Sequence, residues 1–409
     1  MTTADPGLDS AERPRRMGWV AALQEALDRP LASYYLLLGA TALLLTIGLI
    51  MVLSASSVMA YHTSGNSYSI VEKQFVWVVI GLPLAFLFSR LPQRALRRLA
   101  WPGYVVAVLL LIATALVGVR VNGNQNWLSL GGPVQLQPSE MAKFALVLWA
   151  AHVYALKEKR LDRLSDLVVP VVPGFVFATM LVVYGHDLGT SVIIFAIMLG
   201  LLWVVGVPAR FFGVALAGVG GLVALLAITS PERLRRFTTF SDPFKTFHTA
   251  GWQAAHGLWA LASGGVFGQG IGASQQKWGD LPEAQNDFIF AVLGEELGLV
   301  GTLLVVALFL VLAYTIFRIA RESRDPFVRY FSAGVGVWVL VQMMINVGMV
   351  LALFPVVGIP LPLISYGGSS LVPTLVALGI VIGFARREPE AARALAQRKK
   401  SRSAGLAAR

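Results

Sequence analysis

Asp287 is the residue whose type and position are best suited to chemistry. It ends a polar run that starts at Leu281, and the apolar residues that follow from Phe288 are numerous enough to cross a membrane. A carboxylate at such a border can be partly desolvated while it still reaches water and a substrate at the level of the lipid headgroups. The position therefore predicts proton transfer on a lipid-linked substrate. Capping of the helix that begins at Phe288, a common use of aspartate, is the alternative.

Other charged residues could assist such a reaction. Glu140 and Lys143 interrupt an apolar stretch and are spaced i, i+3, so they could simply neutralise each other on one helix face. Ionisable groups inside membrane spans are functional by default, which leaves both interpretations open. Lys277 and Glu283 lie on the loop before Asp287. Lys277 could hold an anionic group, and Glu283 could orient the loop or help to bind a cation.

The segment from Phe354 to Ser370 is mostly apolar, yet its three prolines forbid a continuous helix. Irregular backbone at membrane depth survives only where protein buries it or a wet cavity receives it. Ser365, Ser369 and Ser370 open the last apolar stretch, where free amides and the helix dipole could hold an anion such as a pyrophosphate. Helix capping by serine together with a glycine turn is the simpler alternative.

Four further polar residues have expected structural roles. Asp187 is expected to cap the apolar stretch that follows it. Glu295 and Glu296 are expected to be a packed or water-exposed pair on a helix. Gln342 and Asn346 are spaced i, i+4 on one helix face and are expected to form hydrogen bonds between helices.

Composition places the chain among integral membrane proteins, because 56% of its 409 residues are hydrophobic, 13% are charged, and the mean hydropathy is +0.70. The absence of cysteine excludes disulfides and thiol catalysis. We expect an all-α polytopic fold with ten transmembrane helices, of which the fourth is the weakest because charged residues interrupt it. The apolar stretches lie near residues 33–59, 71–89, 101–119, 138–155, 167–184, 188–206, 210–229, 288–317, 327–352 and 369–385.

The basic residues predict the orientation of these spans. Most of the 33 Lys and Arg fall at the two ends of the chain and in the even-numbered connections, which places both termini in the cytoplasm. The net charge of +11 then follows from topology and anionic headgroups, so nucleic acid is not an expected partner. We expect a polar leader over residues 1–32, a membrane domain over 33–385 and a basic tail over 386–409.

A long outer loop, residues 230–287, separates the seventh and eighth spans, and loops of this length are usually functional. Its arginines at 233, 235 and 236 could attract pyrophosphate, but we expect them to anchor the loop to headgroups. The stretch that holds Trp252 and Trp259 could lie in the membrane interface as an amphipathic helix. The glycines from Gly264 to Gly272 lack the context of a nucleotide loop, so we expect tight backbone packing.

Four spaced motifs resemble the SEDS family (shape, elongation, division and sporulation) of FtsW and RodA type, and the resemblance covers about Asp28 to Arg386. Two residue pairs depart from the family pattern: Gly185-His186 before Asp187, and Gln285-Asn286 before Asp287. The early run Met51 to Ser56 and the stretch from Arg235 to Phe244 are closer to the FtsW branch. The motifs are Asn122 to Gly131 with Gln137-Pro138-Ser139-Glu140 and Lys143; Asp187-Leu188-Gly189-Thr190; Gly251-Trp252-Gln253 through Lys277 to Asp287-Phe288-Ile289-Phe290; and Asn346 through Pro360-Leu361-Pro362 to Ser365-Tyr366-Gly367-Gly368-Ser369-Ser370.

The resemblance implies a peptidoglycan glycosyltransferase in the bacterial plasma membrane that polymerises lipid II, the undecaprenyl-pyrophosphate-linked disaccharide pentapeptide, on the outer face during cell division. It further implies Asp287 as the catalytic base and makes the Glu140/Lys143 pair important. Implied partners are a class B penicillin-binding transpeptidase and other membrane proteins of the division machinery. A lipid II flippase or transporter and a non-enzymatic division scaffold are the competing functions.

No metal ligands can be assigned from the sequence. The five histidines lack zinc spacing. A divalent cation, Mg²⁺ or Mn²⁺, that bridges pyrophosphate oxygens to carboxylates would suit the chemistry, but no cluster of ligands supports it.

Overall fold

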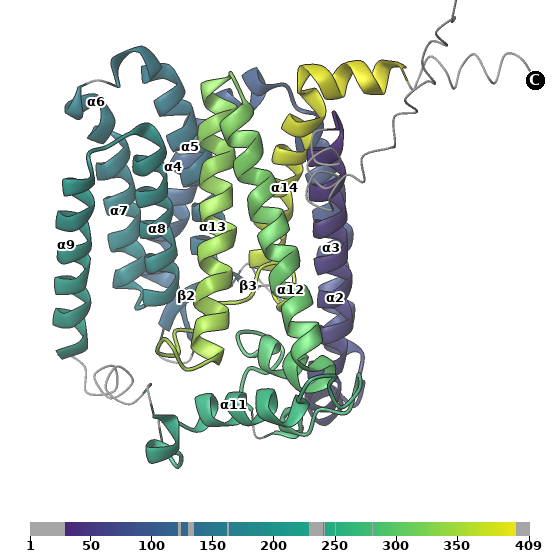
Figure 1. Ribbon diagram of the computed structural model, residues 1–409. Helices are drawn as coiled ribbons and strands as arrows, with labels where there is room; N and C mark the ends of the chain where they lie inside the picture. Colours follow the sequence, from purple (N-terminus) through teal and green to yellow (C-terminus); the bar gives the residue numbers. More distant parts are fainter. Residues whose placement is uncertain are drawn as a thin grey trace, which may run out of the picture.

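The computed structural model describes residues 29–121, 124–129, 135–161, 163–228, 240, 242–249, 251–279 and 281–397. In these residues, long helices run alongside one another in one bundle, and a shorter helix lies across its lower end (Figure 1). The bundle helices are α2 (Ala32–Ser64), α3 (Ser69–Arg90), α4 (Gln93–Val117), α5 (Pro138–Lys157), α7 (Val171–Tyr184), α8 (Leu188–Val205), α9 (Ala209–Ile228), α12 (Ile289–Glu322), α13 (Pro326–Val350) and α14 (Gly368–Arg387).

Eight helices in the described part of the chain are long and apolar enough to cross a membrane, so the expected polytopic all-α class is confirmed. Helices form at the other two expected spans as well, but these two do not meet the same criteria. Charged residues lower the hydropathy of α5, as the sequence indicated for the fourth span. For α9, the piece whose residues are fully described is Ala209–Gly218, an apolar helix shorter than a span. The finding thus supports eight spans, and ten remains a prediction.

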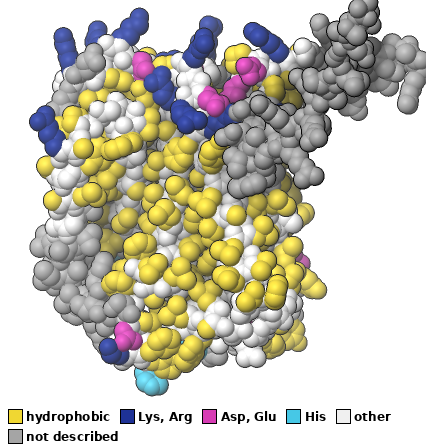
Figure 2. Space-filling view, viewed as in Figure 1, with side chains coloured by type: hydrophobic (Ala, Val, Ile, Leu, Met, Phe, Trp, Pro, Cys, Tyr) yellow, Lys and Arg dark blue, Asp and Glu magenta, His cyan; other side chains and the backbone are white. Residues whose placement is uncertain are grey.

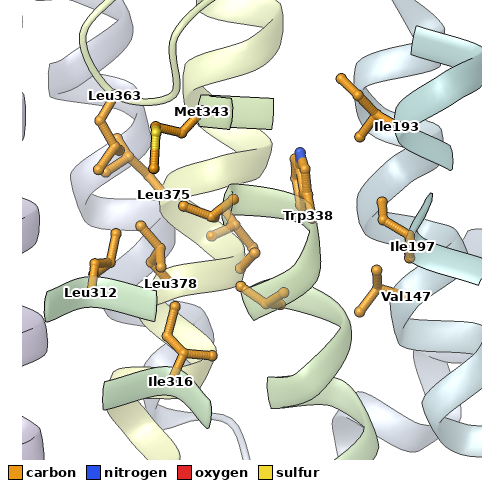
Figure 3. Close-up of a cluster of buried hydrophobic side chains, with 14 of the residues drawn as sticks. Val147, Ile193, Ile197, Leu312, Ile316, Trp338, Met343, Leu363, Leu375 and Leu378 are labelled. Carbon is orange, nitrogen blue, oxygen red and sulfur yellow. The ribbon is translucent and has the colours of Figure 1, made fainter. Parts of the chain in front are cut away.

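Helices α13 and α14 form the centre of the bundle. They are the most buried of the eight candidate spans, whereas 22% of the residues in the most apolar part of α3 and of α4 are buried. α13 packs against α5, α8 and α12, and α14 packs against α3. Figure 3 shows how side chains such as Trp338, Leu375 and Ile316 fill the space between them. The two central helices and the segment that joins them are therefore held from several sides.

The surface of the bundle matches a protein that spans a membrane. Figure 2 shows hydrophobic side chains over its flank and basic side chains gathered at the upper end. Exposed leucines, valines and phenylalanines on α3 and α12 belong to this apolar flank. Apolar flanks and a basic end are the distribution that a lipid bilayer selects.

A small antiparallel sheet between α4 and α5 was not expected from the sequence. Its strands are β1 (Val119–Val121), β2 (Asn124–Ser129) and β3 (Gln135–Leu136), in the order β1-β2-β3. The sequence analysis searched for long apolar spans, and strands of two to six residues are too short to produce such a pattern. The sheet lies next to the beginnings of α5 and α8, at the same end of the bundle as the outer loop (Figure 1).

The described part of the outer loop consists of η2 (Pro243–Thr246), α11 (Trp252–Gly264) and η3 (Gln276–Trp278). α11 lies across the end of the bundle (Figure 1), and its position in the membrane interface stays a prediction. Of the glycines from Gly264 to Gly272, Gly264 and Gly268 pack tightly, as expected, whereas Gly265, Gly270 and Gly272 have no atom within 4 Å of a Cβ. A Cβ on Gly264 would lie 2.0 Å from the carbonyl oxygen of Gly294, and Gly268 has a φ of +79°.

The structure tests little of the predicted domain boundaries. Residues 1–28 and 398–409, which hold most of the predicted leader and half of the predicted tail, lie outside the described residues. α14 ends at Arg387, close to the predicted end of the membrane domain.

Candidate functional site

Asp287 lies in the turn before α12, one residue ahead of the helix N-cap, Phe288. No side-chain hydrogen bond caps α12, so the structure does not have the arrangement in which Asp287 serves as a helix cap. Its side chain is only 8% exposed. The carboxylate is therefore largely desolvated, and capping does not account for its position.

The surroundings of Asp287 favour a carboxyl group that titrates near neutral pH. Burial, and to a smaller extent the negative charge of Glu283, raise the pKa of Asp287 to about 7. The side-chain amide of Asn286 donates a hydrogen bond to Glu283 and holds that carboxylate beside the site. A group with this pKa can accept a proton from a hydroxyl and still be ionised in a useful fraction of molecules at neutral pH.

Asn346 of α13 fixes the backbone at Asp287. Its side-chain nitrogen donates to the carbonyl oxygen of Asp287 at 2.8 Å and to that of Ile359 at 2.7 Å. The hydroxyl of Ser365 donates to the carbonyl oxygen of Asn286 at 2.6 Å. The irregular segment between α13 and α14 therefore packs directly against the turn that carries Asp287. Asn346 does form hydrogen bonds away from its own helix, as predicted, but to backbone carbonyls.

Gln74 of α3 is a residue that sequence reasoning missed. Its amide donates to the carbonyl oxygen of Ser365 at 3.2 Å and accepts the Gly367 N–H at 3.1 Å. One turn further on, Trp77 packs so closely on Gly368 that a Cβ there would lie 2.1 Å from the indole ring. A buried amide in a membrane helix needs a hydrogen-bond partner, and this was the available signal.

The beginning of α14 has no side-chain cap, and its N-cap residue is Gly367. Serine capping, the simpler alternative for this segment, is therefore not what the structure has. Among the described residues, no acceptor pairs with the N–H groups of residues 368–370. Ser369 instead accepts a hydrogen bond from the Gln137 N–H at 3.2 Å, which joins this end of α14 to the beginning of α5. These unpaired amides and the helix dipole favour an anion here.

Glu140 and Lys143 of α5 pair with each other inside the bundle, 2.8 Å apart and fully buried. The Lys143 ammonium also donates to the side-chain oxygen of Gln342 at 2.9 Å, and the Trp338 indole donates to the same oxygen at 2.8 Å. Both donors turn the Gln342 nitrogen toward Pro360, whose carbonyl it reaches at 2.9 Å. The charged pair thus supports the irregular segment from inside the bundle, through Gln342.

Lys277 is buried, and its ammonium has three partners. They are the Glu296 carboxylate at 2.9 Å, the Ser54 hydroxyl at 3.0 Å and the Gly272 carbonyl at 2.7 Å. All three N–H bonds are used, so in this structure Lys277 joins the outer loop to α2 and α12 and has no donor left for an anion. Glu295 also accepts hydrogen bonds from the loop, so the packed interpretation of Glu295 and Glu296 is confirmed.

Asp187 caps α8, as predicted, because its carboxylate accepts hydrogen bonds from the Thr190 N–H at 3.0 Å and the Thr190 hydroxyl at 2.9 Å. It also accepts from the amides of Gln137 at 3.1 Å and Asn126 at 3.4 Å. Asp187 thus fixes the small sheet to the bundle next to Ser139.

Three groups of predicted residues fall into different places. Asp287 and Glu283 lie on the turn that packs against the irregular segment, and Ser365 and the beginning of α14 belong to that segment. Glu140, Lys143 and Lys277 act on the segment or on the loop through other residues. The arginines at 233, 235 and 236 lie outside the described residues. In the described part of the chain, no group of three or more His, Asp or Glu side chains could hold a metal ion.

The sequence matches the family profile of FtsW, RodA and SpoVE, described as "Cell cycle protein", over residues 35–389. The chain is 43% identical over 371 residues to the "Probable peptidoglycan glycosyltransferase FtsW" of Mycobacterium tuberculosis, a match that covers 90% of this chain and 71% of that protein. It is 36% identical over 355 residues to the "Stage V sporulation protein E" of Bacillus subtilis, a match that covers 86% of this chain and 96% of that protein.

Solved structures with the same fold include one described as "Structural coordination of polymerization and crosslinking by a peptidoglycan synthase complex". The TM-score is 0.70 at 28% identity, with 86% of this chain and 96% of that chain covered. The rod shape determining protein RodA of Thermus thermophilus gives a TM-score of 0.64 at 29% identity, with 86% of this chain and 96% of that chain covered.

Proposed function

This chain belongs to the family of FtsW, RodA and SpoVE, and we propose that it polymerises lipid II into glycan strands during cell division, with Asp287 as the catalytic base. It is a peptidoglycan glycosyltransferase of cell-wall synthesis, the activity for which its relatives are named. The observation that supports the choice of Asp287 is its carboxylate, which is almost fully buried at the start of a membrane helix that it does not cap.

The reaction is an inverting displacement in a single step. A hydroxyl oxygen of the acceptor sugar attacks the anomeric carbon of an α-linked pyrophosphate donor and forms the β-1,4 bond. The bond from that carbon to the pyrophosphate oxygen breaks, and its electron pair leaves with the pyrophosphate. Asp287 takes the proton of the attacking hydroxyl, so no covalent glycosyl-enzyme is needed.

The departing pyrophosphate needs compensation of its negative charge but no second carboxylic acid, because it is already a fairly good leaving group. The unpaired N–H groups at the beginning of α14 could supply it, together with the Ser370 side chain. Gln74 and Ser365 hold the turn into α14 next to the turn of Asp287. In this proposal, the attacking hydroxyl lies at Asp287 and the departing pyrophosphate lies at the beginning of α14.

The proposal includes an orientation in the membrane. With α5 and α9 counted as spans, ten helices place both termini in the cytoplasm and put Asp287 on the outer face, the side on which the long loop between the seventh and eighth spans lies. The basic side chains at the upper end of the bundle support this orientation (Figure 2). Glycan strands must be crosslinked after they form, so a class B penicillin-binding transpeptidase is the proposed partner, together with other division proteins.

Purified protein in liposomes with labelled lipid II tests the function. Polymer that depends on Asp287 supports the glycosyltransferase. Movement of lipid II across the bilayer without polymer would support a flippase. Normal recruitment of division proteins by a wild-type chain that makes no polymer would support a scaffold.

Replacing Asn346 by leucine is expected to lower the turnover rate about ten- to a hundred-fold with little change in KM, since small misplacement of a catalytic group has costs of this order. The substitution removes both hydrogen bonds that hold the carbonyls of Asp287 and Ile359. The measurement is initial polymerisation rate against lipid II concentration. Gln342→Leu is the matched control, because it loosens the same segment at Pro360 without touching Asp287. Equal losses in the two variants would contradict a specific role of Asn346.

A further inference from the structure

α12 is interrupted at Gly298, whose φ of 67° and ψ of −164° are not helical. The turn of residues 264–272, here called the glycine turn, packs into this break. A Cβ on Gly298 would lie 2.3 Å from the backbone nitrogen of Gly268, so the two backbones touch. Four backbone hydrogen bonds of 2.9 to 3.1 Å join them: from Gln269 and Gly270 to the carbonyls of Glu295 and Glu296, and from Leu299 and Val300 to the carbonyls of Gly265 and Val266.

These hydrogen bonds satisfy backbone groups that a broken helix and a loop would otherwise expose. Irregular backbone is compatible with a lipid environment only when its N–H and C=O groups are paired. In contrast to its paired backbone groups, the exposed side chains of the glycine turn are apolar. Phe267 is 83% exposed, and Val266 and Ile271 are exposed as well. Residues 257–275 include no charged side chain.

The exposed side chains of the glycine turn continue the lipid-facing surface of α12. Val300 is bonded through its backbone to Val266, and Leu299, Val300 and Leu303 are all exposed on the membrane span itself. Arg318 is about 20 residues beyond Gly298 on this helix, a distance of about 30 Å, the thickness of the hydrocarbon layer. Gly298 and the glycine turn therefore lie at the far border of that layer.

We propose that the glycine turn inserts Val266, Phe267 and Ile271 into the outer leaflet of the bilayer, at the boundary between headgroups and acyl chains. Continuity with the lipid-facing side of α12, the four backbone hydrogen bonds that join the turn to α12 and the absence of charge select lipid as the occupant over a water-exposed loop. The turn is bonded to the first part of α12, which begins two residues after Asp287. Insertion would thus fix the depth of the catalytic turn relative to the headgroups.

The chain has no cysteine, so single-cysteine variants can be labelled directly with an environment-sensitive fluorophore. Phe267→Cys is the test variant, and Ile271→Cys repeats it at a second position. Leu303→Cys on the lipid-facing side of α12 is the control for lipid. Lys245→Cys is the control for water, because the Lys245 side chain is 81% exposed on the same outer loop. Each labelled protein is reconstituted alone in phosphatidylglycerol and phosphatidylethanolamine liposomes.

Insertion predicts that the label at Phe267→Cys is quenched by lipids with a nitroxide near the headgroup, as at Leu303→Cys. Iodide in the outer water should quench it several-fold less than at Lys245→Cys. Iodide quenching equal to that of Lys245→Cys would overturn the proposal. So would protection from iodide that appears only after a partner protein is added, since the turn would then bind protein and not lipid. The readout does not use catalysis, so its failure leaves the proposed reaction untouched.

Discussion

Asp287→Asn is expected to abolish glycan polymerisation, with a loss of about 10²- to 10⁴-fold, the usual contribution of a general base. Asparagine preserves the size of the side chain and removes the carboxylate that accepts the proton. The backbone of this turn is held by Asn346 and Ser365 through carbonyl groups, so the fold does not depend on the charge. The measurement is the initial rate of polymer formation from labelled lipid II in liposomes.

Glu283→Gln is the matched control for this substitution, because it removes the neighbouring negative charge and leaves Asp287 in place. It should retain polymerisation near neutral pH. A polymerisation rate in Asp287→Asn within a few-fold of the wild type, in protein that inserts normally, would contradict the assignment of the base.

Lys143→Met is expected to destabilise the protein by about 3–5 kcal/mol, the cost of leaving one member of a buried ion pair without its partner. The Glu140 carboxylate is fully buried, and its second oxygen already lacks a hydrogen-bond partner among the described residues. Methionine fills much of the lysine volume, so the effect reports the charge and not a cavity. Thermal unfolding in detergent, followed through the solubility of the protein, measures it.

The double variant Glu140→Gln with Lys143→Met separates the charge from the rest of the network. It removes both charges and should recover most of the lost stability, because no unpaired carboxylate is left. Activity should recover less than stability, since Gln342 loses the ammonium that turns its nitrogen toward Pro360. Full recovery of activity would mean that the pair does not help to position the irregular segment.

Long elements and helix caps could be predicted from the sequence because their signals are local. Runs of apolar residues predicted the eight helices that are long and apolar enough to span a membrane. Asp187 before Leu188 predicted the cap of α8. The i, i+3 spacing of Glu140 and Lys143 likewise indicated that they could pair, which the sequence left as one of two interpretations and which the structure has. These statements depend only on residues that are close to one another in the sequence.

The parts that the sequence did not reveal depend on contacts between distant residues. In the sequence, Lys277 is a cation on a polar loop that could hold an anion. In the structure its ammonium donates hydrogen bonds to Glu296 and Ser54, which are 19 and 223 residues away in the chain. Gln74 was missed because its partners follow 291 and 293 residues later in the chain. The small sheet was missed because its strands are shorter than any periodic pattern that could reveal them.

The position of Asp287 is an intermediate case. The sequence located the border between loop and span, and this border is where the structure has the residue. It favoured catalysis and kept capping as the alternative, because the choice depends on whether the carboxylate faces the helix amides. The absence of a side-chain cap on α12 argues against capping, and the role as a base stays a proposal. A Cβ on Gly358, in the segment after α13 and 71 residues further along the chain, would lie 3.8 Å from the Asp287 carboxylate.

The pH dependence of polymerisation tests the central claim most directly. Burial raises the pKa of Asp287 to about 7, so the fraction ionised, and with it the rate, should rise about tenfold for each pH unit below 7 and level off above it. Glu283→Gln removes a charge that raises this pKa, and its curve should therefore shift to lower pH. The account predicts both the rise and the shift. A wild-type rate that stays constant from about pH 5 to 8, or an unshifted curve in Glu283→Gln, would contradict it.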